Sequence, residues 1–200
     1  IEWTIDEILE SKKIMDIVVT TPEVKLINFL KKKYKNKIIV IKRNRKLARV
    51  NSFLEETIIK TCNEYKKSKN KRIDLIALIS TETPFKKKYH LDTAINLINI
   101  FKTDVIISVT SEIENFYTHD GNGLKSIRKD HTLKLESDEV YKEISAIKIM
   151  NYNFFKKNKK IDYNGKIGHL LLDKRSSLVI QDDFDWELAK SMVKINKNEF

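Results

Sequence analysis

Three polar residues, Gln181, Asp182 and Asp183, follow the apolar run 178–180 and stand directly before a helical pattern. In an α/β protein, ligands and metal ions often lie where the carboxyl end of a strand meets the next helix. Carboxylate oxygens are the ligands that Mg²⁺ prefers. Acidic residues at this place also cap the free backbone N–H groups of a helix and complement its dipole. Two roles therefore stay open, a metal site and a helix cap.

Basic residues follow two other expected strands, in the stretches KRNRK (42–46) and STETPFKKK (80–88). At the carboxyl end of a strand, hydroxyls and backbone N–H groups meet ligands, and Lys86, Lys87 and Lys88 would attract phosphate or carboxylate there. The alternative is a strand-to-helix turn with solvated lysines. The sequence alone favours this second interpretation.

Other kinds of site are excluded by the residues that the chain lacks. Its four glycines all lie at or after residue 121, so no Gly-rich loop that cradles a phosphate follows the first strand. If the protein binds a nucleotide, that loop lies upstream of Ile1 or has been lost. The four His residues have no metal-ligand spacing with Cys62 or with one another, and nothing indicates a Ser-His-Asp arrangement.

The elements that must position these residues alternate between strand and helix patterns. We expect strands at 16–20, 37–41, 73–80, 104–110, 145–150, 166–172 and 178–180, and helices at 3–9, 22–30, 52–65, 90–101, 152–155 and from about 183. Alternation of this kind predicts a three-layer α/β fold with a mostly parallel sheet. The polar segment 111–143, with the turn HDGNG (119–123), is expected to form a hairpin or small lobe inserted into a single domain, 1–200.

Composition narrows the class of protein further. The chain has 200 residues, a formal charge of +11 and 41% hydrophobic residues, without an apolar run that could span a membrane. A lone Cys62 fits a reducing, cytoplasmic setting. The Lys residues are spread along the chain, which favours a solvated surface over an anionic small-molecule ligand, with nucleic acid as the weakest alternative. Because the chain starts at Ile1 without a signal-peptide pattern, we expect a segment of a longer protein.

Several stretches also carry a family resemblance. They are IEWTIDEILESKKIMDIVVTT (1–21), RNRKLARVNSFLEETI (43–58), TPFKKKYHLDTAINL (83–97), DVIISVT (104–110), YKEISAIKI (141–149) and SSLVIQDDFDWELAK (176–190). In this order they resemble the acylneuraminate cytidylyltransferases, or CMP-sialic acid synthetases, in which the first stretch follows a Gly-rich nucleotide loop. The resemblance implies a Rossmann-like nucleotidyltransferase fold with a small β-rich lobe that helps to form a homodimer and closes over the partner's site.

The resemblance also implies an activity. The family transfers CMP from CTP to an acidic nine-carbon sugar, with Mg²⁺ as cofactor and release of pyrophosphate. Carried over onto this sequence, Arg43 and Ser52 match nucleotide-binding positions. Lys86, Lys134 and Tyr141 fall at or beside positions that bind the substrate, with Lys86 in place of an Arg.

The metal positions depart from the family. Its metal-binding carboxylates align with Val179 and Gln181, and Val cannot ligate a cation. Asp182 lies one residue away, on the opposite side of an extended strand. Gln181 and Asp182 are therefore weak candidates for a metal, and Asp182 and Asp183 are better interpreted as helix caps.

Two functions remain. The first is a cytidylyltransferase whose phosphate loop lies upstream of Ile1, and the second is a degenerate relative that binds a sugar or a protein without catalysis. In either case, residues 1–200 alone are predicted not to convert CTP to a CMP-sugar, because they lack the triphosphate loop.

Overall fold

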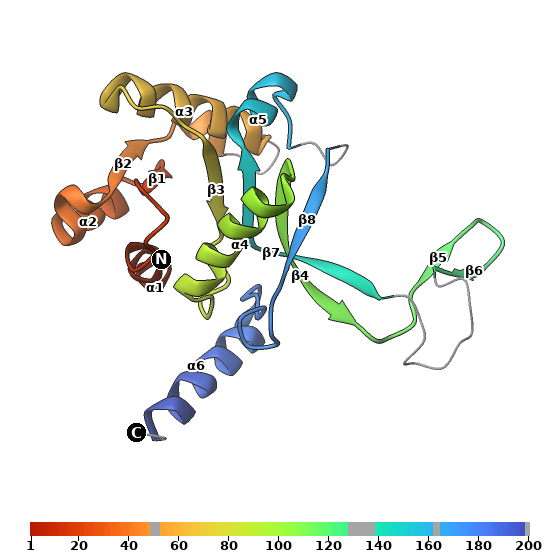
Figure 1. Ribbon diagram of the computed structural model, residues 1–200. Helices are drawn as coiled ribbons and strands as arrows, with labels where there is room; N and C mark the ends of the chain where they lie inside the picture. Colours follow the sequence, from red (N-terminus) through yellow and green to blue (C-terminus); the bar gives the residue numbers. More distant parts are fainter. Residues whose placement is uncertain (49–52, 128–138, 162–164, 199–200) are drawn as a thin grey trace.

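The computed structural model describes residues 1–48, 53–127, 139–161 and 165–198, the last four of these by their backbone alone (Figure 1). Its helices are α1 (Glu2–Leu9), α2 (Val24–Tyr34), α3 (Leu54–Lys69), α4 (Lys88–Phe101), α5 (Tyr152–Asn158) and α6 (Asp183–Asn198), with the short 3-10 helices η1 (Lys35–Lys37) and η2 (Arg45–Ala48). Its strands are β1 (Val18–Thr21), β2 (Ile39–Lys42), β3 (Leu75–Ile79), β4 (Val105–Glu112), β5 (Tyr117–His119), β6 (Leu124–Ser126), β7 (Val140–Asn151) and β8 (Ile167–Leu171).

The main sheet has the strand order β3-β7-β4-β8. β7 runs antiparallel to both of its neighbours, whereas β4 and β8 are parallel. β3, β4 and β8 therefore share one direction, and β7 alone opposes them. A second, two-stranded sheet pairs β1 with β2 in parallel. The prediction of a mostly parallel α/β fold is confirmed, but the reversed direction of β7 was not anticipated.

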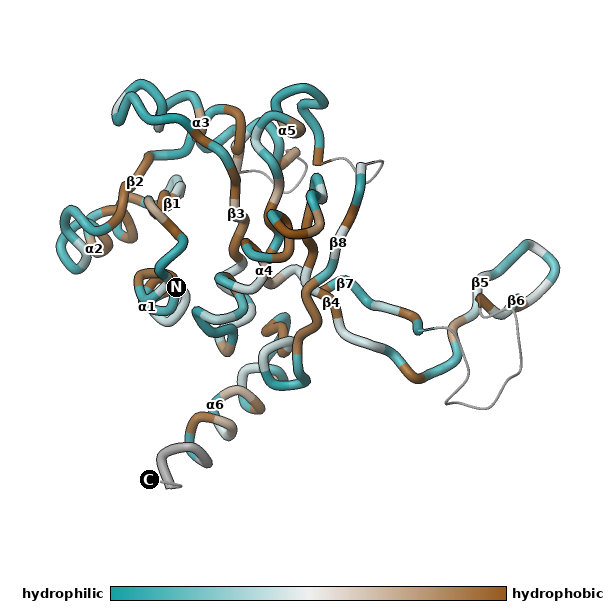
Figure 2. The backbone as a smooth tube through the Cα atoms, viewed as in Figure 1, coloured by the Kyte–Doolittle hydropathy of each residue, from teal (hydrophilic) through white to brown (hydrophobic). Residues whose placement is uncertain are grey.

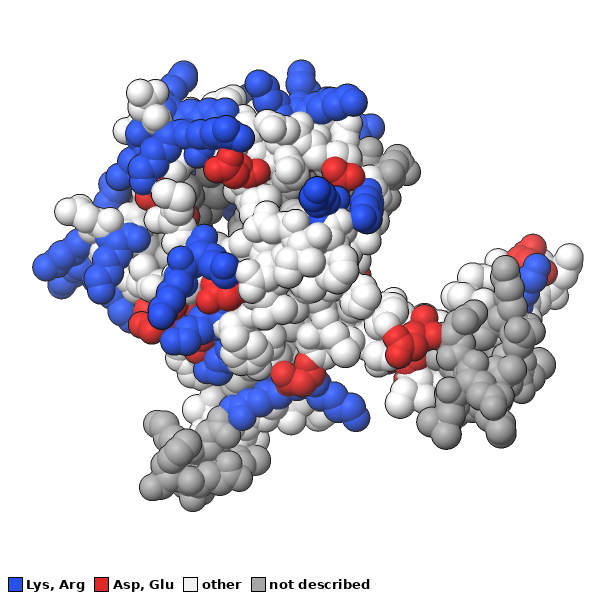
Figure 3. Space-filling view, in the orientation of Figure 1, with Lys and Arg blue, Asp and Glu red and all other residues white. Residues whose placement is uncertain are grey.

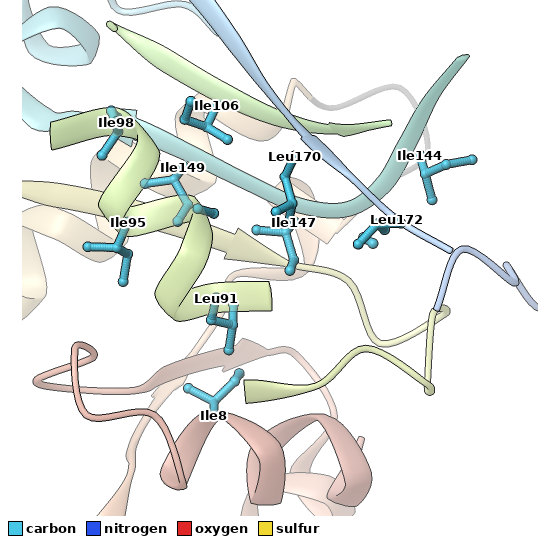
Figure 4. Packing of buried hydrophobic residues seen from close by; sticks show 12 residues of the cluster. Ile8, Leu91, Ile95, Ile98, Ile106, Ile144, Ile147, Ile149, Leu170 and Leu172 are labelled. Atoms are coloured by element: carbon cyan, nitrogen blue, oxygen red, sulfur yellow. The ribbon is translucent and has the colours of Figure 1, made fainter. Parts of the chain in front are cut away.

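Helices cover both faces of the main sheet, which gives the three layers. On one face, Leu91 and Ile95 of α4 pack with Ile147 and Ile149 of β7 in the largest core cluster (Figure 4). On the other face, side chains of α3 and α5 pack against β4 and β7. Figure 2 shows the apolar residues concentrated on the strands and on the inner sides of the helices, as burial of one stripe per helix requires.

The β1–β2 sheet has a small core of its own. Ile5 of α1, Leu30 and Tyr34 of α2, and Ile38 before β2 are buried together there. Ile17 contacts both this cluster and the large core. The two parts of the fold are thus joined through α1 and the chain that leads into β1.

β4 and β7 continue past the body as a two-stranded arm that carries the β5–β6 hairpin (Figure 1). The register of β4 against β7 shifts between Ile107 and Val109. The hydroxyl of Ser108 donates to the carbonyl oxygen of Ile144 and accepts a 3.0 Å hydrogen bond from the backbone N–H of Ile147. The hairpin expected at 119–123 is present, and the expected lobe 111–143 begins inside β4 and ends inside β7.

The run 178–180 is not a strand, contrary to our expectation. Val179 packs against the large core, and the backbone N–H of Ile180 donates a 2.8 Å hydrogen bond to the carbonyl oxygen of Glu82. The apolar run therefore reflects packing against the core and not a ladder of strand pairing. None of the described helices is both long and apolar enough to cross a membrane.

Candidate functional site

Residues at the carboxyl ends of β1, β2 and β3 line one cavity of about 1150 Å³. Polar lining comes from Thr20 and Thr21 at the end of β1, Arg43 after β2, and Ser80 and Thr81 after β3. Further polar lining comes from the chain before β1 and β3 and from β7, including Asp16, Lys71, Glu143 and Lys148, and the apolar lining comes largely from β1, β3, α1 and α3. The space is open to solvent between the α2 side of the molecule and the main sheet (Figure 3). The carboxyl ends of three strands thus supply polar groups to a single apolar cavity, which is the usual setting of a ligand site in an α/β fold.

Arg43 is the charged residue that best fits a ligand contact in this cavity. Its backbone N–H donates a 2.9 Å hydrogen bond to the carbonyl oxygen of Thr21, which fixes the chain beside the end of β1. Its side-chain Nε is buried and has no hydrogen-bond partner among the described residues. A buried guanidinium donor without an acceptor costs about 1–3 kcal/mol or more, so an anionic ligand that accepts from it would be bound favourably. The structure thus places Arg43 in the lining of the cavity, and its predicted contact with a nucleotide stays a prediction.

Lys86 is buried, with 1% of its surface exposed. Its Nζ donates to the carbonyl oxygens of Ser80 and Thr83 and to the hydroxyls of Thr83 and Thr4. Burial lowers the pKa of the Lys86 ammonium to about 8. These bonds tie the loop after β3 to α1, so the ammonium holds the loop in place. The predicted substrate contact at Lys86 stays untested, and in this arrangement the ammonium is already occupied by the protein's own oxygens.

Asp182 and Asp185 form reciprocal caps at the start of α6. The Oδ1 of Asp182 accepts a 2.9 Å hydrogen bond from the backbone N–H of Asp185. The Oδ2 of Asp185 accepts from the backbone N–H groups of Gln181 and Asp182 at 2.9 and 3.4 Å. Such a pair satisfies N–H groups that a helix start leaves free. The capping interpretation of Asp182 agrees with this geometry, and Asp183 lies in the first turn.

The described residues do not fit a Mg²⁺ site. They contain no group of three or more His, Cys, Asp or Glu side chains that could hold a metal ion. Two of the carboxylates nearest to the predicted position, those of Asp182 and Asp185, already accept backbone hydrogen bonds. Mg²⁺ needs several oxygen ligands in near-octahedral geometry, which Gln181 beside two capping carboxylates does not offer.

The remaining predicted site residues lie elsewhere. Tyr141 is on β7 in the arm, where its ring packs on that of His169 with 4.8 Å between centroids and its hydroxyl donates to Glu139. It is not among the described residues that line the cavity. Ser52 and Lys134 lie outside the described residues. The backbone N-cap of α3 is Phe53.

Sequence reasoning missed several residues of this site. The hydroxyl of Thr21 accepts a 3.2 Å hydrogen bond from the backbone N–H of Glu23 and so orders the turn after β1. Thr83 is fully buried and binds Lys86 through both its carbonyl and its hydroxyl. Thr21 could have been predicted as a site residue, because its hydroxyl stands at the end of an apolar strand. The partnership of Thr83 and Lys86 has no comparable signal, since three consecutive lysines give no indication of which one turns inward.

Basic side chains cover much of the surface over α2 and α3 (Figure 3). Many belong to the last turns of these helices, such as Lys31, Lys33 and Lys69. Cations there complement the helix dipole, so their position has a structural explanation that needs no ligand.

Sequence comparisons find no family model and no curated protein that match the chain. Comparison with solved structures gives clear matches. A 4-diphosphocytidyl-2C-methyl-D-erythritol synthase from Anaerococcus prevotii superposes with a TM-score of 0.66 at 14% identity, covering 96% of this chain and 85% of that one. A second structure described as a 4-diphosphocytidyl-2C-methyl-D-erythritol synthase gives 0.71 at 8% identity, covering 96% and 87%. A CMP:2-keto-3-deoxy-manno-octonic acid synthetase in complex with CTP gives 0.67 at 6% identity, covering 98% and 88%.

These similarities show that the folds are alike. Sequence identities of 6–14% do not show a shared activity or substrate. The chain shares the Rossmann-like α/β fold of these synthases and of the CMP-sugar synthetase. The expected fold class is confirmed, while the finer resemblance to the acylneuraminate enzymes stays a prediction.

Proposed function

We propose that this protein is a cytidylyltransferase-like domain that binds the phosphates of CTP at the carboxyl ends of β1, β2 and β3. The observation that carries the proposal is the Nε of Arg43, a buried donor without a partner among the described residues, in the lining of the cavity. A nucleotide phosphate supplies the acceptor and the negative charge that this guanidinium lacks.

The similar folds support the choice of nucleotide. One of the superposed structures is described as a complex with CTP, and the products or substrates named for all three contain a cytidine nucleotide. The acceptor that we propose is an acidic sugar of the nonulosonic type. That choice rests on the collinear sequence resemblance, and an acidic sugar is also part of the name of the superposed CMP-sugar synthetase.

In the reaction that we propose, an oxygen of the sugar acid attacks the α-phosphorus of CTP, and pyrophosphate leaves. Arg43 holds phosphate oxygens and offsets their charge, while the hydroxyls of Thr20, Ser80 and Thr81 lie in the same lining. Lys86 keeps the loop 80–83 in place by its bonds to Ser80 and Thr83. The described carboxylates do not form a Mg²⁺ site, so no step is assigned to a metal.

A degenerate binding domain is the second candidate, and one observation favours it. Asp182, a candidate for the metal, is used as a helix cap. A domain that keeps nucleotide or sugar affinity without a metal site would bind without catalysing transfer.

Assembly as a homodimer is part of the same proposal. Tyr117, Leu124 and Ile127 on the arm are 52%, 73% and 50% exposed, which gives the hairpin apolar side chains that a second subunit would cover. Sedimentation equilibrium should then give twice the monomer mass, and Leu124→Asp should reduce it to the monomer mass. A monomer at high concentration would contradict this part of the proposal.

Calorimetric titration of CTP with and without Mg²⁺ tests the proposed function. Binding of CTP in preference to ATP, with an affinity that Arg43→Ala reduces, supports it. Release of pyrophosphate when a sialic acid is added would identify a transferase and would overturn the expectation that residues 1–200 alone do not convert CTP. Absence of CTP binding under both conditions would contradict the proposal.

A further inference from the structure

His90 caps the helix in which it lies. It is the third residue of α4, and its Nδ1 accepts a 3.0 Å hydrogen bond from the backbone N–H of Lys87, the residue before the helix. α4 packs here on α1, where Leu91 lies beside Ile8 (Figure 4). A Glu or Gln side chain at the third position often makes the same bond, because the N–H groups at the start of a helix have no partner within it. An imidazole differs from these side chains, since its nitrogen stops accepting when the ring is protonated.

The bond from Lys87 fixes the protonation state of His90. A backbone N–H can only donate, so Nδ1 is the unprotonated acceptor and the proton of the neutral ring lies on Nε2. A second proton would be added at Nδ1 and would point at the N–H of Lys87, whose nitrogen is 3.0 Å away. The protonated ring therefore cannot cap α4 in this arrangement.

Charged groups of α1, of the start of α4 and of the loop after β8 face the ring of His90. Burial has the largest effect and lowers the pKa of His90 below its ordinary value of 6.5, because the residue is 4% exposed. The carboxylates of Asp173 and Glu7 favour protonation, and the ammonium of Lys87 opposes it. The ring of Tyr89 lies 4.0 Å away between centroids. Above pH 6.5 the ring is neutral, and as the pH falls through the lowered pKa the folded protein takes up a proton and loses the cap.

Asp173 keeps its negative charge while His90 is protonated. Its carboxylate accepts hydrogen bonds from the backbone N–H groups of Arg175 and Ser176 at 2.8 and 2.9 Å and from the Ser176 hydroxyl at 2.8 Å. Burial raises the pKa of Asp173, but these bonds together with the charge of His90 lower it below its ordinary value. To accept from a protonated Nδ1, this carboxylate would have to give up a bond within its own loop.

The cap at His90 holds the far end of the loop 80–87. The first two residues of this loop line the cavity. Its last residue, Lys87, donates to His90, and the backbone N–H of Lys88 donates a 2.9 Å hydrogen bond to Glu7 of α1. Protonation of His90 removes the first of these two bonds and leaves the second. The loop that forms one wall of the cavity is thereby loosened where it enters α4.

We propose that His90 is a proton-sensitive latch for the loop 80–87. Its neutral ring caps α4 and holds the loop in the wall of the cavity, and protonation of the ring releases the loop. The latch acts on the shape of the cavity and is independent of which ligand the cavity binds.

Hydrogen exchange of the backbone amides in the loop 80–87 tests the latch, with protection factors that remove the intrinsic effect of pH on exchange. In the wild type, the protection of these amides should fall about fivefold from about pH 8 to about pH 5, while β4 and β7 stay protected. His90→Gln keeps an acceptor that does not titrate, and should abolish the fall. His119→Gln is the matched control, because His119 Nδ1 accepts a 3.0 Å bond from the backbone N–H of Gly121 in the exposed hairpin, and this variant should behave as the wild type does.

Equal falls in the wild type and in His90→Gln would overturn the proposal, because the proton would then act at another group. Constant protection of the wild-type loop over the whole range would also overturn it. Nitrogen NMR of the wild-type ring provides a second test that needs no variant. It should show the neutral ring with its proton on Nε2 at about pH 8, and a proton on Nδ1 there would contradict the latch. Neither readout involves a nucleotide, so both results are independent of the proposed function.

Discussion

The backbone N–H of Arg43 donates to the carbonyl oxygen of Thr21 across 2.9 Å, which extends the pairing of β1 and β2 by one step. Beyond this bond the chain leaves the sheet, and the side chain of Arg43 lines the cavity with its Nε unpaired among the described residues. The main chain of Arg43 is thus fixed by the sheet, while its charge is left for a ligand. This separation of roles is the basis of the function that we propose.

The buried ammonium of Lys86 predicts a pH dependence of stability. Its pKa is about 8 in the folded protein and 10.5 for an ordinary lysine. Between these values the unfolded chain binds the proton more tightly, so the unfolding free energy rises with pH as the cost of burying the charge disappears. The unfolding free energy of the wild type, relative to that of Lys86→Met, should therefore increase by about 3 kcal/mol from pH 8 to pH 10.5. Urea unfolding at several pH values measures this difference.

Lys87→Met is the matched control for this prediction, because Lys87 is exposed and pairs with Glu7 at 2.7 Å. Its stability relative to the wild type should not rise over the same pH range. A difference between the wild type and Lys86→Met that stays constant from pH 8 to pH 10.5 would show that Lys86 has an ordinary pKa.

The capping role of Asp182 predicts a loss of stability that is independent of metal. Asp182→Ala removes the acceptor of the Asp185 N–H bond and should cost about 1 kcal/mol, measured by urea unfolding. The cost should be the same with Mg²⁺ and with a chelator. Asp183→Ala, in the first turn, should cost less. A stabilisation by Mg²⁺ that the wild type shows and Asp182→Ala loses would instead assign the carboxylate to a metal.

Close packing of β8 against β4 predicts that Gly168 tolerates no side chain. A Cβ at this position would meet Ile106 Cδ1 at 2.5 Å and Thr103 Cγ2 at 3.2 Å. Ile106 is 1% exposed in the core and has little room to move. Gly168→Ala should therefore cost about 1–3 kcal/mol by thermal or urea unfolding. Gly123→Ala, with open space around the new Cβ, should stay within about 0.5 kcal/mol, and equal costs at both positions would contradict the packing described here.

Much of the fold could be predicted from apolar runs alone. The runs around Val19, Val40 and Ile76 became strands because a buried parallel strand needs apolar side chains on both faces. The direction of β7 could not be predicted, since the pattern of side chains along a strand does not specify its direction. The prediction of a strand at 178–180 was wrong because a run of three apolar residues occurs in loops that pack against a core as well as in strands.

The candidate site was predictable only in part. Arg43 could be placed because it directly follows a strand, and the carboxyl ends of parallel strands meet at one edge. The inward turn of Lys86 depends on acceptors at Ser80 and Thr83 that converge only in the folded loop. The caps at Asp182 and Asp185 are local in sequence, and for that reason the helix-cap interpretation of Asp182 could be reached without a structure.

The most direct test of the central claim is the affinity for CTP of three proteins, the wild type, Arg43→Lys and Arg45→Lys, by titration calorimetry. Arg45 is an exposed neighbour in η2 and serves as the matched control. Lys keeps the charge but loses the planar guanidinium and its Nε donor, so Arg43→Lys should weaken binding about tenfold, or about 1.4 kcal/mol. Arg45→Lys should bind as the wild type does. Equal affinities for all three proteins, or no binding of CTP to any of them, would contradict a nucleotide site at Arg43.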